Sequence, residues 1–374
     1  MIAQCVKRLK SSRGIVTLYI LIHAVFFAPH TLADVSAPGS YGLKIYNVNS
    51  ILYPFVQVYI RTFDHNKQPL VNLNEMNIGL MVKGRSYDPM KRQYAIQTIR
   101  QRSDAVRSVI ILDASKSMSR SGYLSSLQAA AGFIDAKRPQ DEVAILAIRD
   151  TKEGYEVVSN FERDPRALAR RMADIKMNGM KSRIYDAIGA ALQMCAMSSQ
   201  GSTVSSSLGN FIASCSIVIF SDGRDEGSAL SREELNARIT SLEIPVPVYS
   251  LAYGSSAQNH FINLESLSKN SFGVYYLIGD TIDRMTRVVE EIQNILLSDY
   301  VVTFRSYEPI DGEQHALRIG VEYPSGSKKF TYDNNRFEAL EPPPVAEIDN
   351  EISVLSQRIP SSPDGNPYFP ARDQ

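Results

Sequence analysis

Strands and helices alternate between Val106 and Ser298, and this alternation constrains the fold of the chain more than any other feature. The segment "VRSVIILD" is a continuous apolar run, and "YLSSLQAAAGFIDAK" after it combines good helix formers with one apolar face. The same order returns in "CSIVIFSDG" before "SREELNARITSLE" and in "VPVYSLAYG" before "HFINLESLSK". Because strands that are apolar throughout are typical of sheets covered on both faces, the sequence predicts a doubly wound, mostly parallel α/β sheet.

Two regions with a β pattern flank this α/β block. In residues 34–105 the segment "YPFVQVYIRTFD" alternates between apolar and polar side chains, and "DHNKQP" after it supplies turn residues. In residues 299–340 the segments "YVVTFRSYE" and "HALRIGVEY" indicate further strands. Since the two ends of a domain often lie close together, we expect both regions to form one β-sandwich, with the domain of residues 106–298 inserted in it.

The C-terminal tail, residues 341–374, is rich in proline and polar residues, and most of it is expected to be disordered. One part differs, because apolar side chains recur at helical spacing at Ile348, Ile352, Leu355 and Ile359. This stripe predicts a short amphipathic helix, which we expect to dock on the protein itself rather than on a partner.

The N-terminus has the pattern of a secretory signal, residues 1–33. A basic head is followed by the short apolar run "IVTLYILIHAVFFA" and by small residues that end in Ala33. The run is shorter than the about twenty residues that a bilayer span needs, so we expect cleavage after Ala33 and export to the periplasm or the cell surface. An uncleaved membrane anchor is the alternative, and membrane contact is expected only in that case.

Charge and cysteine content narrow the class of protein further. The chain has 40 basic and 40 acidic residues, so no basic excess points to nucleic acid. Cys5 leaves with the signal, and Cys195 and Cys215 remain. Cys195 ends a predicted helix and Cys215 opens the next strand, so an exported protein would join them in a disulfide. Two unpaired buried thiols are the alternative.

Oxygen-bearing side chains follow two of the predicted strands. Asp113, Ser115 and Ser117 come after one apolar run, and Asp222 ends another. In open α/β sheets, ligands bind beyond the carboxyl ends of the strands, where the strand order reverses, so these side chains are expected to face one crevice. Carboxylate and hydroxyl oxygens suit Mg²⁺. Because hydroxyls leave the ion under-neutralised, such a site favours a further carboxylate from outside.

These segments resemble the metal-ion-dependent adhesion site of von Willebrand factor A domains, a Rossmann-like family. "DASKSM" is similar to the family's DxSxS element, "SRIYDA" to the element that supplies a threonine ligand, and "FSDGRDEG" to its acid-bearing strand end. The resemblance covers residues 106–298, about half of the chain, and the flanking β segments look similar to those of exported bacterial members. It implies Mg²⁺ (or Mn²⁺) bound by Asp113, Ser115, Ser117, Ser182 and Asp222.

The chain departs from the family pattern at Ser182, which keeps the hydroxyl but lacks the methyl group that stiffens threonine. Arg183 beside it adds positive charge. An A domain with a vestigial site is therefore the alternative. Asp225 and Glu226 are expected to be solvated loop charges, and Asp186 to complement the dipole of the helix that it opens.

The resemblance implies that the protein binds a protein partner, whose Asp or Glu completes the metal sphere, in adhesion or envelope assembly. A structural subunit of an envelope complex is the second hypothesis. A metal-dependent hydrolase is the third, but the chain lacks HExxH, GxSxG and Walker motifs, and the "SLSK" segment lies in a predicted helix without companion motifs. We therefore expect no enzyme.

Overall fold

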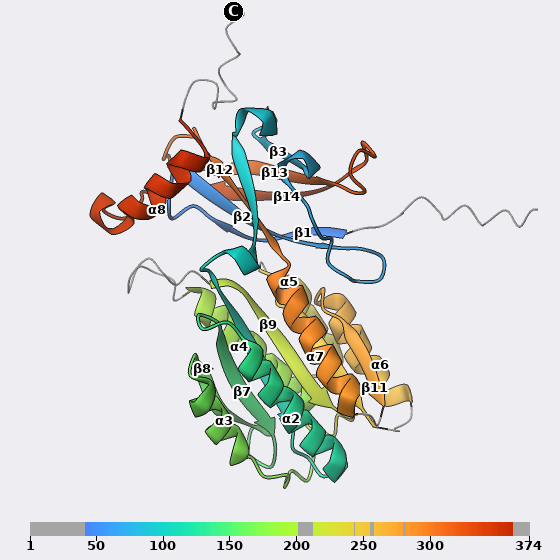
Figure 1. Ribbon diagram of the computed structural model, residues 1–374. Helices are drawn as coiled ribbons and strands as arrows, with labels where there is room; N and C mark the ends of the chain where they lie inside the picture. Colours follow the sequence, from blue (N-terminus) through green and yellow to red (C-terminus); the bar gives the residue numbers. More distant parts are fainter. Residues whose placement is uncertain (1–41, 201–211, 243, 255–257, 280–281, 362–374) are drawn as a thin grey trace, which may run out of the picture. The chain divides into compact units, whose positions relative to one another are not determined.

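The computed structural model describes residues 42–200, 212–242, 244–254, 258–279 and 282–361 (Figure 1). The predicted signal and the polar segment between the two cysteines, residues 201–211, lie outside the described residues. No helix among the residues described has the length and the apolar character needed to cross a membrane.

A six-stranded sheet forms the centre of the α/β block, with the strand order β11-β10-β9-β6-β7-β8. All neighbouring strands run parallel except β7 and β8, which a short connection joins as an antiparallel pair. The sheet confirms the predicted fold class. Its strands are β6 (Ala105–Asp113), β7 (Glu142–Ile148), β8 (Tyr155–Glu162), β9 (Ile212–Ser221), β10 (Val248–Tyr253) and β11 (Tyr275–Gly279).

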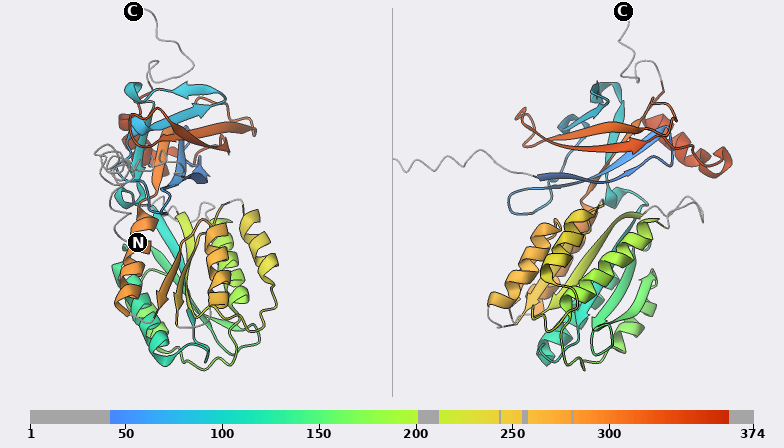
Figure 2. Two further views of the ribbon diagram at one scale, coloured as in Figure 1. Left: turned by 90° about the vertical axis from the view of Figure 1, so that its right-hand side faces the viewer. Right: turned by 180° about the vertical axis from the view of Figure 1, so that it is seen from behind.

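Helices cover both faces of this sheet, and the left view of Figure 2 shows the two helical layers on either side of it. One layer packs its apolar side chains on one face and consists of α2 (Arg120–Ala136), α3 (Pro165–Ala173) and α7 (Ile282–Leu297). The other layer consists of α4 (Ile184–Gln200), α5 (Arg232–Ser241) and α6 (Gln258–Asn270). Local sequence fixes where some of them begin: Asp164 caps α3 with Pro165 at its first position, and Ser231 and Glu234 form the predicted capping box of α5.

The remaining strands form two antiparallel four-stranded sheets. The first has the order β1-β2-β12-β5 and consists of β1 (Gly42–Asn49), β2 (Phe55–Phe63), β12 (Tyr300–Arg305) and β5 (Tyr94–Thr98). The second has the order β14-β13-β3-β4 and consists of β14 (Phe330–Glu338), β13 (Gln314–Glu322), β3 (Ile78–Val82) and β4 (Arg85–Tyr87). Short 3₁₀ helices within the described residues span Glu75–Asn77, Pro89–Lys91 and Ile99–Gln101.

Both antiparallel sheets combine strands from before and after the α/β block. β12 pairs with β2 and β5, and β13 pairs with β3. The two sheets pack through aromatic side chains, because Phe304 of the first contacts Tyr87 and Phe337 of the second edge to face. The chain therefore leaves this β structure after β5, builds the α/β block, and returns to it with β12.

The tail contains helix α8, Val345–Arg358, where the sequence predicts an amphipathic helix. Ile348, Leu355 and Ile359 are buried and form one apolar cluster with Leu52, Phe55 and Ala95 of the β region. This confirms docking on the protein itself. Residues 362–374 lie outside the described part.

The predicted disulfide between Cys195 and Cys215 is present, with the two Cα atoms 5.7 Å apart. The prediction was wrong about the element ends, because α4 continues to Gln200 and β9 begins at Ile212. The bridge therefore joins the interior of a helix to the interior of the strand beneath it, and not two element ends.

Candidate metal centre

The candidate site lies at the carboxyl ends of β6 and β9, which are adjacent parallel strands as predicted. β6 ends at Asp113, and β9 ends at Ser221, directly before Asp222. α2 follows β6 on one face of the sheet, and α4 lies on the other face. The strand order reverses here, so both acids stand where ligands bind in such sheets.

Asp113 is fully buried, and its carboxylate is held by hydroxyl and amide groups. The hydroxyl of Ser182 donates to its Oδ2 atom at 2.9 Å, and the hydroxyl of Ser221 donates to the same atom at 2.7 Å. The amide of Ser115 donates to Oδ1 at 3.1 Å. Three separate segments of the chain therefore converge on one carboxylate.

The loop after Asp113 is fixed by a close backbone contact with Gly179. Ser115 pairs with Gly179 in an isolated parallel bridge, in which the Gly179 amide donates to the carbonyl of Ala114 and the Lys116 amide donates to the carbonyl of Gly179. A Cβ atom at position 179 would lie 3.0 Å from the Cα atom of Ser115, so only glycine fits without a backbone shift. Ser117 approaches Ser115 from the next turn, with 2.8 Å between the two hydroxyl oxygens.

Asp222 supplies a buried oxygen that the described residues leave unsatisfied. Its Oδ1 atom accepts from the amide of Arg224 at 3.1 Å, but Oδ2 has no hydrogen-bond partner among them, and the nearest cation, Arg224 Nε, is 3.9 Å away. Burial raises the pKa of the Asp113 carboxyl, hydrogen bonds from Ser115 and Ser221 oppose the rise, and the charge of Asp222 adds to it. Two buried carboxylates that repel each other are a setting that a cation stabilises.

One acid near the site differs from its predicted role, whereas Asp186 lies in the first turn of α4 as predicted. Asp225 is not a solvated charge: its Oδ1 atom accepts from the amide of Ile184 at 2.9 Å and from the hydroxyl of Ser228 at 2.6 Å, so it caps α4 from another segment. The carboxylate of Asp186 in addition accepts from the amides of Ala229 and Leu230, both at 2.9 Å. These bonds tie the loop after Asp222 to the helix that follows Ser182.

The structure thus brings all five predicted oxygen-bearing residues to one end of the sheet: Asp113, Ser115, Ser117, Ser182 and Asp222. Sequence reasoning missed Ser221, whose hydroxyl orients Asp113. Its signal was a polar residue that interrupts an apolar strand one position before the strand-end acid. The donor set consists of two carboxylates and several hydroxyls, and one buried oxygen has no hydrogen-bond partner among the described residues. Such a set fits a hard divalent cation.

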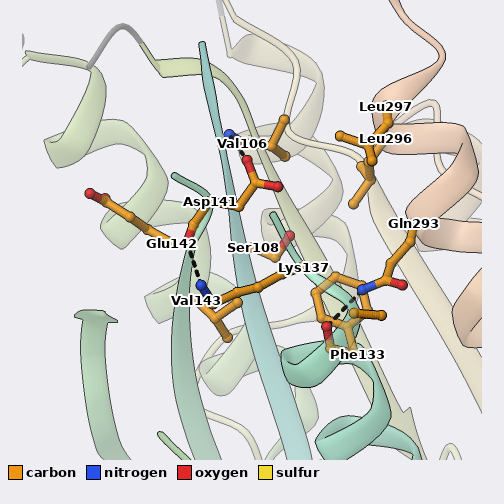
Figure 3. A pocket seen from close by; sticks show the side chains of 11 residues that line it. Val106, Ser108, Phe133, Lys137, Asp141, Glu142, Val143, Gln293, Leu296 and Leu297 are labelled. Atoms are coloured by element: carbon orange, nitrogen blue, oxygen red, sulfur yellow. Dashed lines mark hydrogen bonds between the residues drawn. The ribbon is translucent and has the colours of Figure 1, made fainter. Parts of the chain in front are cut away.

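A small cavity lies at the other end of the same sheet, beside the beginning of β6. Figure 3 shows the apolar side chains of Phe133, Leu296 and Leu297 in its wall, with the amide of Gln293 bonded to the carbonyl of Phe133. Its volume of about 30 Å³ suits little more than one water molecule. This cavity is therefore too small for an organic ligand.

The fold and the oxygen cluster define an α/β domain with a candidate metal site at its switch point. Residues 108–224 match the family model described as von Willebrand factor type A domain, so the α/β block of this chain contains such a domain.

The crystal structure of the SpRpn10 VWA domain is similar to half of this chain, with a TM-score of 0.36 and 16% sequence identity. The similar region covers 50% of this chain and 94% of that one. No curated protein sequence matches the chain.

Proposed function

We propose that this protein is a metal-dependent binding module. Asp113, Ser115, Ser117, Ser182 and Asp222 would hold one Mg²⁺ or Mn²⁺ ion. The bound ion would act as a Lewis acid that accepts a carboxylate from an Asp or Glu of a protein partner. The protein itself would orient the ion through its hydroxyls, exclude water around Asp113, and carry out no covalent chemistry.

The observation that carries the proposal is the Oδ2 atom of Asp222, which is buried beside Asp113 and has no hydrogen-bond partner among the residues that the structure describes. A buried carboxylate oxygen without a hydrogen bond is costly, and the nearby carboxylate of Asp113 increases this cost. A divalent cation would satisfy Asp222 and offset its repulsion with Asp113. Hydroxyl ligands carry no charge, so the ion would keep enough positive charge to attract an external acid.

The disulfide between Cys195 and Cys215 supports a place in an oxidising compartment, as the predicted export requires. VWA domains commonly mediate protein–protein interaction, which supports adhesion or envelope assembly as the setting. A structural subunit with a vestigial metal site is the competing function, and it predicts that the domain neither binds the ion nor gains stability from it.

Calorimetric titration of the metal-free protein with Mg²⁺ and Mn²⁺ tests the metal site. We expect one ion per chain and a higher melting temperature in the wild type, because a ligand that binds the folded state stabilises it. Asp222→Asn should lose both effects. Glu226→Gln is the matched control, because it removes an exposed charge from the same loop without touching Asp113 or Asp222. Absence of heat and of stabilisation in the wild type would favour the structural subunit.

Binding of a partner is tested with the same variants. Immobilised wild-type protein should retain a partner from the cell envelope in Mg²⁺ and release it in EDTA, whereas Asp222→Asn should retain nothing in either buffer. Circular dichroism of the variant checks that it is folded. Retention that neither EDTA nor the substitution changes would contradict a metal-dependent mode of binding.

A further inference from the structure

Each loop that carries a proposed metal ligand also carries a cation close to that ligand in sequence. Lys116 stands between Ser115 and Ser117, Lys181 directly precedes Ser182, and Arg224 follows Asp222 by two positions. Three segments that are far apart in the sequence therefore bring positive charge to the same end of the sheet. The two lysines are not needed to hold the oxygens of Asp113 in place, since hydroxyl and amide groups do that.

Lys116 and Lys181 lie on an exposed ridge with Met180 between them. The Lys116 amide donates to the carbonyl of Gly179, and its ammonium group is 2.9 Å from the sulfur of Met180. Both lysines are exposed, and Met180 is 62% exposed. Within the part of the chain that the structure describes, no carboxylate lies within ion-pair distance of either lysine.

Most acids around this ridge have other partners. Asp225 caps α4, the Oδ1 atom of Asp150 accepts from the amide of Met180, and Asp186 and Glu156 form ion pairs with arginines at 2.7 Å. Glu226 and Glu153 are exposed. The ridge beside the proposed ion, which we define as Lys116, Met180 and Lys181, is therefore positively charged with an apolar centre.

From this arrangement we infer that the site takes an acidic peptide segment with at least two carboxylates. One carboxylate completes the metal sphere, and a second, a few residues away, meets Lys116 and Lys181. The apolar surface of Met180 contacts the chain between them. This inference rests on the proposed function, and it adds that a lone carboxylate is a poor ligand, because exposed charge pairs add to affinity and to selection of the partner.

Two fluorescein-labelled peptides test the inference by anisotropy in Mg²⁺ at low salt. Both are glycine–serine octapeptides; one carries a single Asp, and the other carries the same Asp with two Glu residues, one on each side and each a few positions away. We expect the wild type to bind the triacidic peptide about tenfold more tightly than the monoacidic one. Lys116→Gln/Lys181→Gln should bring the two affinities to within about threefold of each other, because only exposed ion pairs are lost.

The control variant is Lys67→Gln/Lys91→Gln, which removes the same charge from the β region, where neither lysine forms an ion pair with a described residue. It should retain the wild-type preference. Equal affinity of the wild type for the two peptides, or a preference that survives loss of both ridge lysines, would overturn the inference. A different result would contradict the proposed function: binding of neither peptide would depend on Mg²⁺, and the ion itself would not bind to the protein.

Discussion

At the scale of single residues, the candidate site depends on hydroxyls that support a carboxylate as much as on the carboxylate itself. Asp113 has no exposed surface, and two serine hydroxyls donate to one of its oxygens. Groups behind a metal ligand fix its orientation and raise its affinity for the ion. Ser221 belongs to this supporting set, because its hydroxyl also accepts from the amide of Gly223 at 3.0 Å.

Ser221→Ala should therefore weaken metal binding by about tenfold without removing any proposed ligand. The lost hydroxyl leaves Oδ2 of Asp113 with one hydrogen bond fewer and frees the turn at Gly223. Titration with Mn²⁺ measures the change. Ser216→Ala is the control, because Ser216 is equally buried in the same strand but approaches Ser108, at 3.3 Å, rather than the site. Equal affinity of the two variants for the ion would show that Ser221 plays no part.

The residues of the site differed in how far sequence could predict them. Asp113, Ser115 and Ser117 are close in sequence, so their spacing alone carries the signal. The role of Asp225 could not be found in this way, because it caps a helix that begins about forty residues earlier in the chain, at Ile184. In the local sequence Asp225 is one polar loop residue among several, and nothing near it indicates a contact with the distant helix.

At the scale of elements, β5 is an edge strand whose outward amides are blocked by side chains. The Glu75 carboxylate accepts from the amide of Ile96 at 3.2 Å, and the Gln101 side-chain oxygen accepts from the amide of Thr98 at 3.0 Å. A groove of about 620 Å³ runs beside this strand. Unprotected edges invite pairing with another chain, so these two side chains keep the edge from acting as a template.

Glu75→Ala/Gln101→Ala should expose the edge of β5 and promote self-association of the protein. Sedimentation velocity over a range of concentrations measures this, with an expected shift toward dimers or larger species. Glu75→Gln is the control, because its side-chain oxygen can still accept from the amide of Ile96. A double variant that remains at the wild-type sedimentation coefficient would contradict a protective role.

The helices and strands with a clear hydrophobic period were predicted from the sequence. The elements whose pairing depends on residues far away in the chain were not. The apolar stripe of α8 and the buried strands of the α/β block follow from spacing alone. β1 carries a mixed pattern, and a shift of register between Ile45 and Asn47 interrupts its pairing with β2. Tertiary packing likewise decides which strands from before the α/β block pair with strands from after it. The periodicity of a single sequence does not predict such pairings.

At the scale of the whole described chain, the chain passes twice between the β structure and the α/β block, and a buried ion pair lies at each of these two connections. Arg102 pairs with Asp104 just before β6, and Arg61 pairs with Asp299 just before β12, both at 2.6 Å. Apolar contacts join the same regions, because Tyr59 and Val301 share one core cluster with side chains of α2 and α7. The β structure and the α/β block are therefore expected to unfold together.

Arg61→Met tests this coupling, because it leaves the buried Asp299 without its cation. Removing one partner of a buried pair costs about 3–5 kcal/mol, whereas the double variant Arg61→Met/Asp299→Leu should recover much of that loss, since two apolar side chains replace the ion pair. Arg163→Met breaks a pair with Glu142 that is partly exposed and should change the melting temperature little. Scanning calorimetry should give one transition that moves as a whole in Arg61→Met. If two transitions appear and only one of them responds, the ion pair at Asp299 stabilises a single region, and the β structure folds independently of the α/β block.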